Sequence, residues 1–114
     1  MSHTIQIEEK TVNGVTLTVR TSGLENDGDL ILFMHGFPEN AKMWDPAMLH
    51  MAEKGFRCIA PDQRGYSAKA RFDDITNYRV PNMVADAFAL VEAYGGGKFH
   101  IVGHDWGSVI SWRM

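Results

Sequence analysis

Apolar and polar positions follow two different patterns in the first third of the chain. In residues 4–8 and 15–21 they alternate one by one, which predicts two strands that each expose one face. Asn13-Gly14 between them is a strong signal for a two-residue hairpin turn. Residues 30–34 are apolar throughout, which is typical of a strand covered on both faces in a parallel sheet. The pattern therefore predicts an antiparallel hairpin followed by a buried strand.

Helical spacing of apolar residues predicts three helices further along the chain. The first begins near Asp45-Pro46, with the aspartate as N-cap and the proline at the first helical position, and stops at Gly55. The second covers about residues 81–94, where apolar side chains recur every three or four positions. Residues 108–114 form the beginning of the third helix. Each of these helices is expected to pack its apolar face against the sheet.

Two more short apolar runs, residues 56–60 and 99–102, predict the remaining strands. Residues 62–78 are polar and irregular, so they predict a long excursion over the surface. Strands that alternate with helices indicate an α/β fold with a mostly parallel sheet, preceded here by the antiparallel hairpin. A chain of 114 residues supports one domain. We therefore expect a single α/β domain over residues 1–114.

Composition excludes several classes of function. The net charge of −3 provides no basic face for nucleic acid or anionic lipid. No apolar run approaches the roughly 20 residues of a membrane span, so no membrane contact is expected. The histidines lack the spacing of a metal site, and we assign neither a metal nor a cofactor. The single cysteine, Cys58, lies in an apolar strand pattern, which indicates a buried thiol and a cytoplasmic location.

The sequence Gly103-His104-Asp105-Trp106-Gly107 follows the last apolar strand and opens the third helix. Small residues on both sides of a potential nucleophile are typical of a nucleophile elbow, a tight strand-to-helix turn that exposes the central side chain. Here that side chain is a carboxylate, which is ionised at neutral pH and needs no base to attack a saturated carbon. The alternative interpretation is that Asp105 simply caps the helix.

Three segments together resemble the N-terminal part of an α/β-hydrolase of the epoxide hydrolase type. In chain order they are His35-Gly36-Phe37-Pro38-Glu39, Pro61-Asp62-Gln63-Arg64-Gly65-Tyr66-Ser67 and Val102-Gly103-His104-Asp105-Trp106-Gly107. They match the family's oxyanion loop, its D-x-R-G segment and its elbow, each after the corresponding strand. The resemblance covers nearly the whole chain and implies the N-terminal half of that fold.

The resemblance also implies a role for each matched position. Asp105 would be the catalytic nucleophile, and the backbone N–H groups of Phe37 and Trp106 would form an oxyanion hole. The remaining residues of the loop and elbow would support these groups, and they are His35, Gly36, Pro38, Gly103 and Gly107. Pro38 is cis in relatives. Arg64 is expected to hold a loop near the elbow, whereas His104 is expected to point away from the site.

A haloalkane dehalogenase is the nearest alternative enzyme. In that group a tryptophan after the nucleophile, here Trp106, donates its indole N–H to the departing halide. Those enzymes usually have Asn or Glu where this chain has Phe37, so the loop favours an epoxide hydrolase. Fluoroacetate dehalogenases share the H-G-F-P loop but have arginine after the nucleophile, so Trp106 argues against that group.

In the family the nucleophile forms an alkyl-enzyme ester, and a histidine oriented by an acid then activates water to cleave it. The resemblance places this histidine, its acid partner, the later strands and the cap domain beyond Met114. The expected function is therefore that of an epoxide hydrolase-like hydrolase acting on a small apolar substrate, such as an epoxide or a haloalkane. Turnover by the 114 residues alone is not expected.

The resemblance also predicts that one edge of the sheet is left unpaired, which we call the open side of the sheet. Residues 99–102 would form an apolar edge strand, and such edges promote pairing with other chains. We therefore expect a homo-oligomer or a complex with a complementary fragment. The alternative to an enzyme is a non-catalytic half-fold that self-assembles and retains the elbow only as scaffold.

Overall fold

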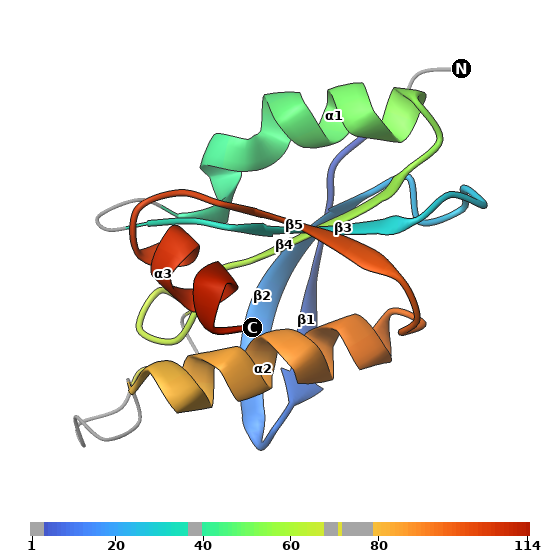
Figure 1. Ribbon diagram of the computed structural model, residues 1–114. Helices are drawn as coiled ribbons and strands as arrows, with labels where there is room; N and C mark the ends of the chain where they lie inside the picture. Colours follow the sequence, from blue (N-terminus) through green and yellow to red (C-terminus); the bar gives the residue numbers. More distant parts are fainter. Residues whose placement is uncertain (1–3, 37–39, 68–70, 72–78) are drawn as a thin grey trace.

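A five-stranded sheet with helices on both faces makes up the part of the chain that the computed structural model describes, residues 4–36, 40–67, 71 and 79–114 (Figure 1). The strands are β1 (Gln6–Val12), β2 (Val15–Ser22), β3 (Leu30–Met34), β4 (Arg57–Pro61) and β5 (Phe99–Gly103). The helices are the 3-10 helix η1 (Ala41–Trp44) and the α-helices α1 (Asp45–Glu53), α2 (Val80–Ala93) and α3 (Trp106–Arg113). The predicted α/β class is confirmed.

The strand order across the sheet is β1-β2-β4-β3-β5. β3 runs parallel to β4 and β5, whereas β1 pairs antiparallel with β2, and β2 pairs antiparallel with β4. The β1–β2 hairpin turns at Asn13 and Gly14, whose φ angles of 50° and 75° are the positive values that a type I′ turn requires. The hairpin predicted from Asn13-Gly14 is therefore confirmed.

Successive residues of β3 belong to two separate cores. Leu32 and Met34 pack on the side of α2 and α3, in a cluster that includes Leu90. Phe33 packs on the side of α1, in a cluster that includes Met48. Figure 1 shows α1 on one face of the sheet and α2 and α3 on the other. The continuous apolar run is thus explained by burial of both faces of the strand.

The predicted role of Asp45 as an N-cap is wrong. Asp45 is the first residue of α1, its N-cap position is occupied by Trp44, and no side chain caps this helix end. The reason is that η1 leads directly into α1, so the preceding helical turn replaces a cap. The Asp45 carboxylate instead accepts two hydrogen bonds from Arg20 of β2, each 2.8 Å long.

The open side of the sheet lies at β5, which has β3 as its single neighbour among the described strands. Apolar side chains are exposed on β5 and on α3 beside it. Val102 is 38% exposed and Trp112 is 90% exposed. The predicted apolar edge is confirmed in the described structure.

Candidate active site

The connection between β5 and α3 consists of only two residues, His104 and Asp105. Asp105 has φ 58° and ψ −120°, a conformation that non-glycine residues rarely adopt and that costs energy. Its side chain is exposed at the carboxyl end of the parallel strands. Residues 103–107 are the segment predicted as a nucleophile elbow, and the turn within this segment is strained and exposes one side chain.

Three glycines leave no room for a side chain around this turn. A Cβ atom on Gly107 would lie 2.1 Å from the carbonyl oxygen of Met34, and one on Gly103 would lie 2.7 Å from the carbonyl oxygen of Gly107. A Cβ atom on Gly36 would lie 2.4 Å from the Cβ atom of Asp105. The glycines at these positions therefore let β3, β5 and α3 approach closely enough to form the turn.

The alternative interpretation of Asp105 as a helix cap is not supported. Its side chain makes no capping hydrogen bond to the first turn of α3. That turn is closed by the backbone instead, since Gly107 N–H donates to the His104 carbonyl and Ser108 N–H donates to the Asp105 carbonyl, each at 2.9 Å. The carboxylate is thus not required for the helix to begin.

His35 lies at the carboxyl end of β3 and is only 1% exposed. The backbone N–H of Gln63 donates to its Nε2 atom at 3.2 Å, so Nε2 is an acceptor and the ring proton lies on Nδ1. Nδ1 then donates to the carbonyl of Gly36 at 3.0 Å. The side-chain amide of Gln63 also donates to the His35 carbonyl at 2.6 Å. His35 therefore connects the turn after β4 to the loop after β3.

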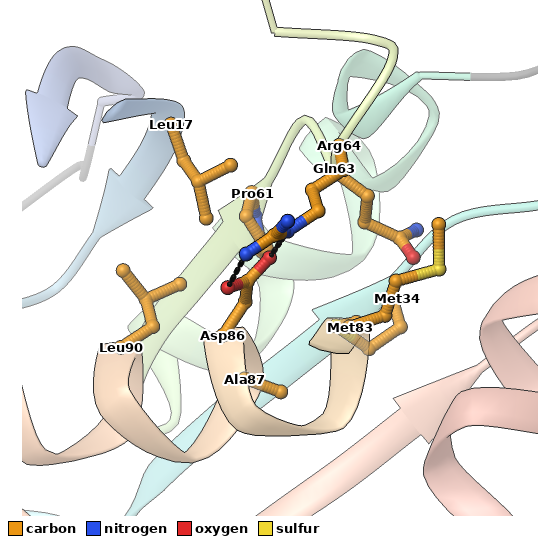
Figure 2. Close-up of a pocket in the computed structure, with 9 residues that line it drawn as sticks. All are labelled: Leu17, Met34, Pro61, Gln63, Arg64, Met83, Asp86, Ala87 and Leu90. Carbon is orange, nitrogen blue, oxygen red and sulfur yellow. Dashed lines mark hydrogen bonds and ion pairs between the residues drawn. The ribbon is translucent and has the colours of Figure 1, made fainter. Parts of the chain in front are cut away.

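Arg64 forms a buried ion pair with Asp86 of α2 (Figure 2). Its Nε atom donates to Oδ2 at 2.5 Å and its Nη2 atom donates to Oδ1 at 3.0 Å, while the two side chains are 6% and 7% exposed. The amide of Asn13 donates to Oδ1 as well, at 2.9 Å. The expected role of Arg64 in holding a loop agrees with these contacts.

Gln63 and Asp86 were not predicted as site residues. A signal for Asp86 was present, because this carboxylate stands among the apolar positions of α2, between Met83 and Leu90. A charge on the buried face of a helix indicates a buried partner. Gln63 gave no such signal, since a glutamine in a polar turn is ordinary.

A cavity of about 620 Å³ adjoins the elbow. It is lined by Gly36, by Tyr66 in the turn after β4, and by apolar side chains of α2 and α3 that include Met83 and Ile110. The ring of Tyr66 meets the His35 ring edge-on, with centroids 4.6 Å apart. Burial raises the pKa of the Tyr66 hydroxyl, and the negative charge of Asp105 raises it further. The cavity therefore lies within electrostatic reach of the Asp105 carboxylate.

Some of the predicted site residues cannot be compared with the structure. Phe37 and Pro38 lie outside the described residues, and only the backbone of Trp106 is described. Trp106 is the first residue of α3, so its N–H has no acceptor within the helix. His104 is exposed beside Asp105.

Among the described residues, no three His, Cys, Asp or Glu side chains lie close enough together to hold a metal ion. The helices within that part of the chain are too short or too polar to cross a membrane. Cys58 is fully buried in β4, as predicted, and burial raises the pKa of its thiol to about 11.

Comparisons with known proteins agree with this geometry. The family model for the alpha/beta hydrolase fold matches residues 29–114. An AB hydrolase superfamily protein of Bacillus subtilis is 38% identical over 102 residues, which cover 90% of this chain and 35% of that protein. Epoxide hydrolase A of Mycobacterium tuberculosis is 38% identical over 101 residues, which cover 89% of this chain and 31% of that protein.

Solved structures of epoxide hydrolases are also similar to this chain. An epoxide hydrolase of Vigna radiata superposes with a TM-score of 0.87 at 34% identity, over 96% of this chain and 34% of that structure. Epoxide Hydrolase A of Mycobacterium thermoresistibile superposes with a TM-score of 0.90 at 33% identity, over 96% of this chain and 34% of that structure. The chain thus spans about a third of the length of the relatives that it matches. Because the family model matches residues 29–114, most of its length, the chain belongs to the alpha/beta hydrolase fold family.

Proposed function

We propose that this chain is the nucleophile-bearing part of an epoxide hydrolase-like hydrolase, with Asp105 as the nucleophile. The observation that carries the proposal is the strained backbone of Asp105, at φ 58°, which exposes a carboxylate that caps no helix. Strain of this kind persists where the surrounding structure enforces it, and it is concentrated at functional sites. The similarity to epoxide hydrolases, at 33 to 38% identity in three comparisons, supports this reaction class.

In the proposed reaction a carboxylate oxygen of Asp105 attacks an epoxide carbon. The carbon–oxygen bond of the ring breaks, the released oxygen takes a proton from water, and an alkyl ester links the substrate to the enzyme. Water then adds to the ester carbonyl, and the oxyanion formed there would be stabilised by the N–H groups of Phe37 and Trp106. Hydrolysis releases a diol and restores the carboxylate.

The second half of this reaction needs a base. His35 is buried and uses both ring nitrogens, and His100 pairs with Asp29 at the amino end of the parallel strands, away from the elbow. We propose that residues 1–114 form a single core domain, and that the base, its acid partner and a cap come from polypeptide outside these residues. This agrees with a chain that spans about a third of its relatives.

A small apolar epoxide is the proposed substrate. The cavity of about 620 Å³ lies within the usual range for small-molecule sites. Met83, Val80 and Ile110 give it apolar walls, while Arg64 and Arg79 also line it. No cofactor is proposed, because the Asp105 carboxylate and backbone N–H groups would supply the chemistry.

The proposal is tested by covalent labelling of the 114-residue protein with styrene oxide, followed by peptide mass mapping. We expect one adduct per chain, on Asp105, and no sustained formation of diol. Asp105→Asn should lose this adduct, because a neutral amide is a poor nucleophile. Its far-UV circular dichroism should be unchanged, since the side chain caps no helix.

Glu53 provides a matched control for general carboxylate reactivity, because it is an exposed carboxylate at the end of α1, on the other face of the sheet from α3. Labelling spread over several surface carboxylates, or retained in Asp105→Asn, would contradict the assignment. The haloalkane alternative uses the same nucleophile, so halide release in a single turnover with 1-bromohexane, without labelling by styrene oxide, would favour it instead.

We also propose that the open side of the sheet is covered by a further polypeptide. The observation that favours this is the exposed apolar surface of β5 and α3, where Val102, Val109 and Trp112 are 38%, 38% and 90% exposed. Monomeric proteins rarely leave such an edge uncovered. Native mass spectrometry separates a homo-oligomer from a complex with a complementary fragment, and a monomer at high concentration would contradict both.

An assembled oligomer without labelling of Asp105 would favour the non-catalytic half-fold. The proposed location is the cytoplasm, because the lone buried thiol of Cys58 needs no oxidising compartment. Cell fractionation followed by immunoblotting tests that location, and recovery in a secreted fraction would contradict it.

A further inference from the structure

The buried ion pair between Arg64 and Asp86 is fully satisfied by protein groups (Figure 2). Both carboxylate oxygens accept hydrogen bonds from Arg64, and Asn13 adds a third donor at 2.9 Å. The adjoining cavity measures only about 10 Å³, at the lower limit for one water molecule. Asp86 therefore fixes the Arg64 guanidinium at two points, and little space for water adjoins this contact.

Arg64 directly follows Gln63, the residue that binds His35. Gln63 makes two hydrogen bonds to His35, one from its backbone N–H to Nε2 at 3.2 Å and one from its side chain to the carbonyl at 2.6 Å. Fixing the Arg64 side chain on α2 restrains the peptide unit next to it. The ion pair and the bonds to His35 thus form one continuous connection from α2 to the end of β3.

His35 passes this restraint to the loop beside the elbow. Because Nε2 accepts from Gln63, Nδ1 holds the proton and donates to the Gly36 carbonyl at 3.0 Å. A Cβ atom on Gly36 would lie 2.4 Å from the Cβ atom of Asp105, so the Gly36 backbone lies directly beside the proposed nucleophile. Holding the Gly36 carbonyl therefore fixes the backbone next to Asp105.

We propose that Asp86 is a positioning residue for the nucleophile site: through Arg64 and Gln63 it keeps His35 in one tautomer and so holds the Gly36 carbonyl, in the loop to which the proposed function assigns one oxyanion donor. This inference rests on the proposed function of Asp105. A buried ion pair is weak grounds for stability, because well-packed apolar residues often replace it without loss. A role in orienting the site accounts for the pair more fully than stability does.

The first measurement is the tautomer of His35 by ¹⁵N NMR of histidine-labelled protein, with signals assigned by their loss in His35→Gln. In the wild-type protein we expect a single tautomer with the proton on Nδ1. In Asp86→Asn we expect the signals to broaden or to shift toward a mixture. Arg64→Lys should act in the same direction, since it keeps a cation beside Asp86 and spares the fold but loses the two-point contact.

The second measurement is the rate at which hydroxylamine cleaves the styrene oxide ester of Asp105. This reaction passes through the same type of oxyanion and needs no base histidine. We expect Asp86→Asn to slow it by about tenfold, because complete loss of one oxyanion donor costs roughly 10²–10³. The matched control is Asp45→Asn, which breaks the Arg20–Asp45 pair on the other side of the sheet and should leave both readouts unchanged.

The outcomes separate the two proposals. If the wild-type protein takes no label on Asp105, the proposed function fails while the tautomer measurement still tests the connection from Asp86 to His35. If labelling succeeds but folded Asp86→Asn and Arg64→Lys keep the wild-type tautomer and cleavage rate, the positioning role is overturned. An equal loss in Asp45→Asn would also overturn it, because the effect would then be one of general stability.

Discussion

The backbone of Asp105 stores strain that its neighbours make possible. A non-glycine residue in this conformation lowers the free energy of unfolding by about 1–3 kcal/mol. The turn can form because Gly36, Gly103 and Gly107 leave room for it. Gly36 faces the Asp105 side chain itself, at 2.4 Å from a would-be Cβ atom to the Cβ atom of Asp105. At this scale the glycines are as much a part of the candidate site as the carboxylate.

Gly107→Ala tests this steric argument. Within a helix, alanine is ordinarily favoured over glycine by up to about 1 kcal/mol. Here the new methyl group would meet the backbone of Met34 and His35, neither of which moves easily. We therefore expect the substitution to reduce the free energy of unfolding by about 2–4 kcal/mol.

Urea unfolding followed by circular dichroism measures this change. Ser108→Ala, at the next position of α3, serves as the control and should lie within about 0.5 kcal/mol of the wild type. Unchanged or increased stability of Gly107→Ala would contradict the close approach of α3 to β3.

Among the elements, β3 does most to assemble the candidate site. Its alternate residues bury both faces of the sheet, and its carboxyl end carries His35 and Gly36. Its last carbonyl, that of Met34, accepts a hydrogen bond from the N–H of His104 at 3.2 Å. Because β3 and β5 run parallel, their carboxyl ends lie at the same edge of the sheet, which brings the two loops together.

The contact between β2 and α1 gives a prediction at the scale of elements. If Asp45 acted as an N-cap, Asp45→Asn would be nearly neutral, since asparagine caps helices equally well. In the structure its carboxylate binds Arg20 at two points, and that hydrogen bonding raises the pKa of Arg20. We expect Asp45→Asn to lower the free energy of unfolding by about 1 kcal/mol.

A double-mutant cycle with Arg20→Gln checks this expectation by urea unfolding. The double variant should be no less stable than either single variant, because both remove the same interaction. A neutral effect of Asp45→Asn would restore the capping interpretation.

On the scale of the whole molecule, the two edges of the sheet differ. β1 and β5 are the edge strands, and β5 lies beside an exposed apolar surface that includes Val102 and Trp112. Large aromatic side chains dominate the energy of protein interfaces. The side of the molecule beside β5 is therefore where association is expected.

Trp112→Lys tests this expectation by sedimentation equilibrium. A buried interface tryptophan contributes about 2 kcal/mol or more to the free energy of association. We therefore expect the dissociation constant of the oligomer to rise roughly thirtyfold in Trp112→Lys. Ile7→Lys is the matched control, because Ile7 is an apolar side chain, 59% exposed, on the opposite edge strand. A larger effect of Ile7→Lys than of Trp112→Lys would place the interface elsewhere.

Features that depend on neighbouring residues were predictable from the chain alone. The hairpin at Asn13-Gly14, the buried run of β3 and the small residues around Asp105 are all local patterns, because backbone conformation and burial periodicity are set within a few residues. For the same reason the strands and α-helices were found with errors at their ends, as in α3, which begins at Trp106 rather than at residue 108, and β1, which was predicted over 4–8 but spans Gln6–Val12. The 3-10 helix η1 was not predicted.

Contacts between distant residues were decided only by the tertiary structure. Arg64 and Asp86 are 22 positions apart, Gln63 and His35 are 28 apart, and Asn13 and Asp86 are 73 apart. A side chain's partner in such a pair depends on strand order and helix placement, which no local pattern encodes. Asp45 illustrates the point, because its local signal indicated a cap while the fold brought Arg20 of β2 to its carboxylate.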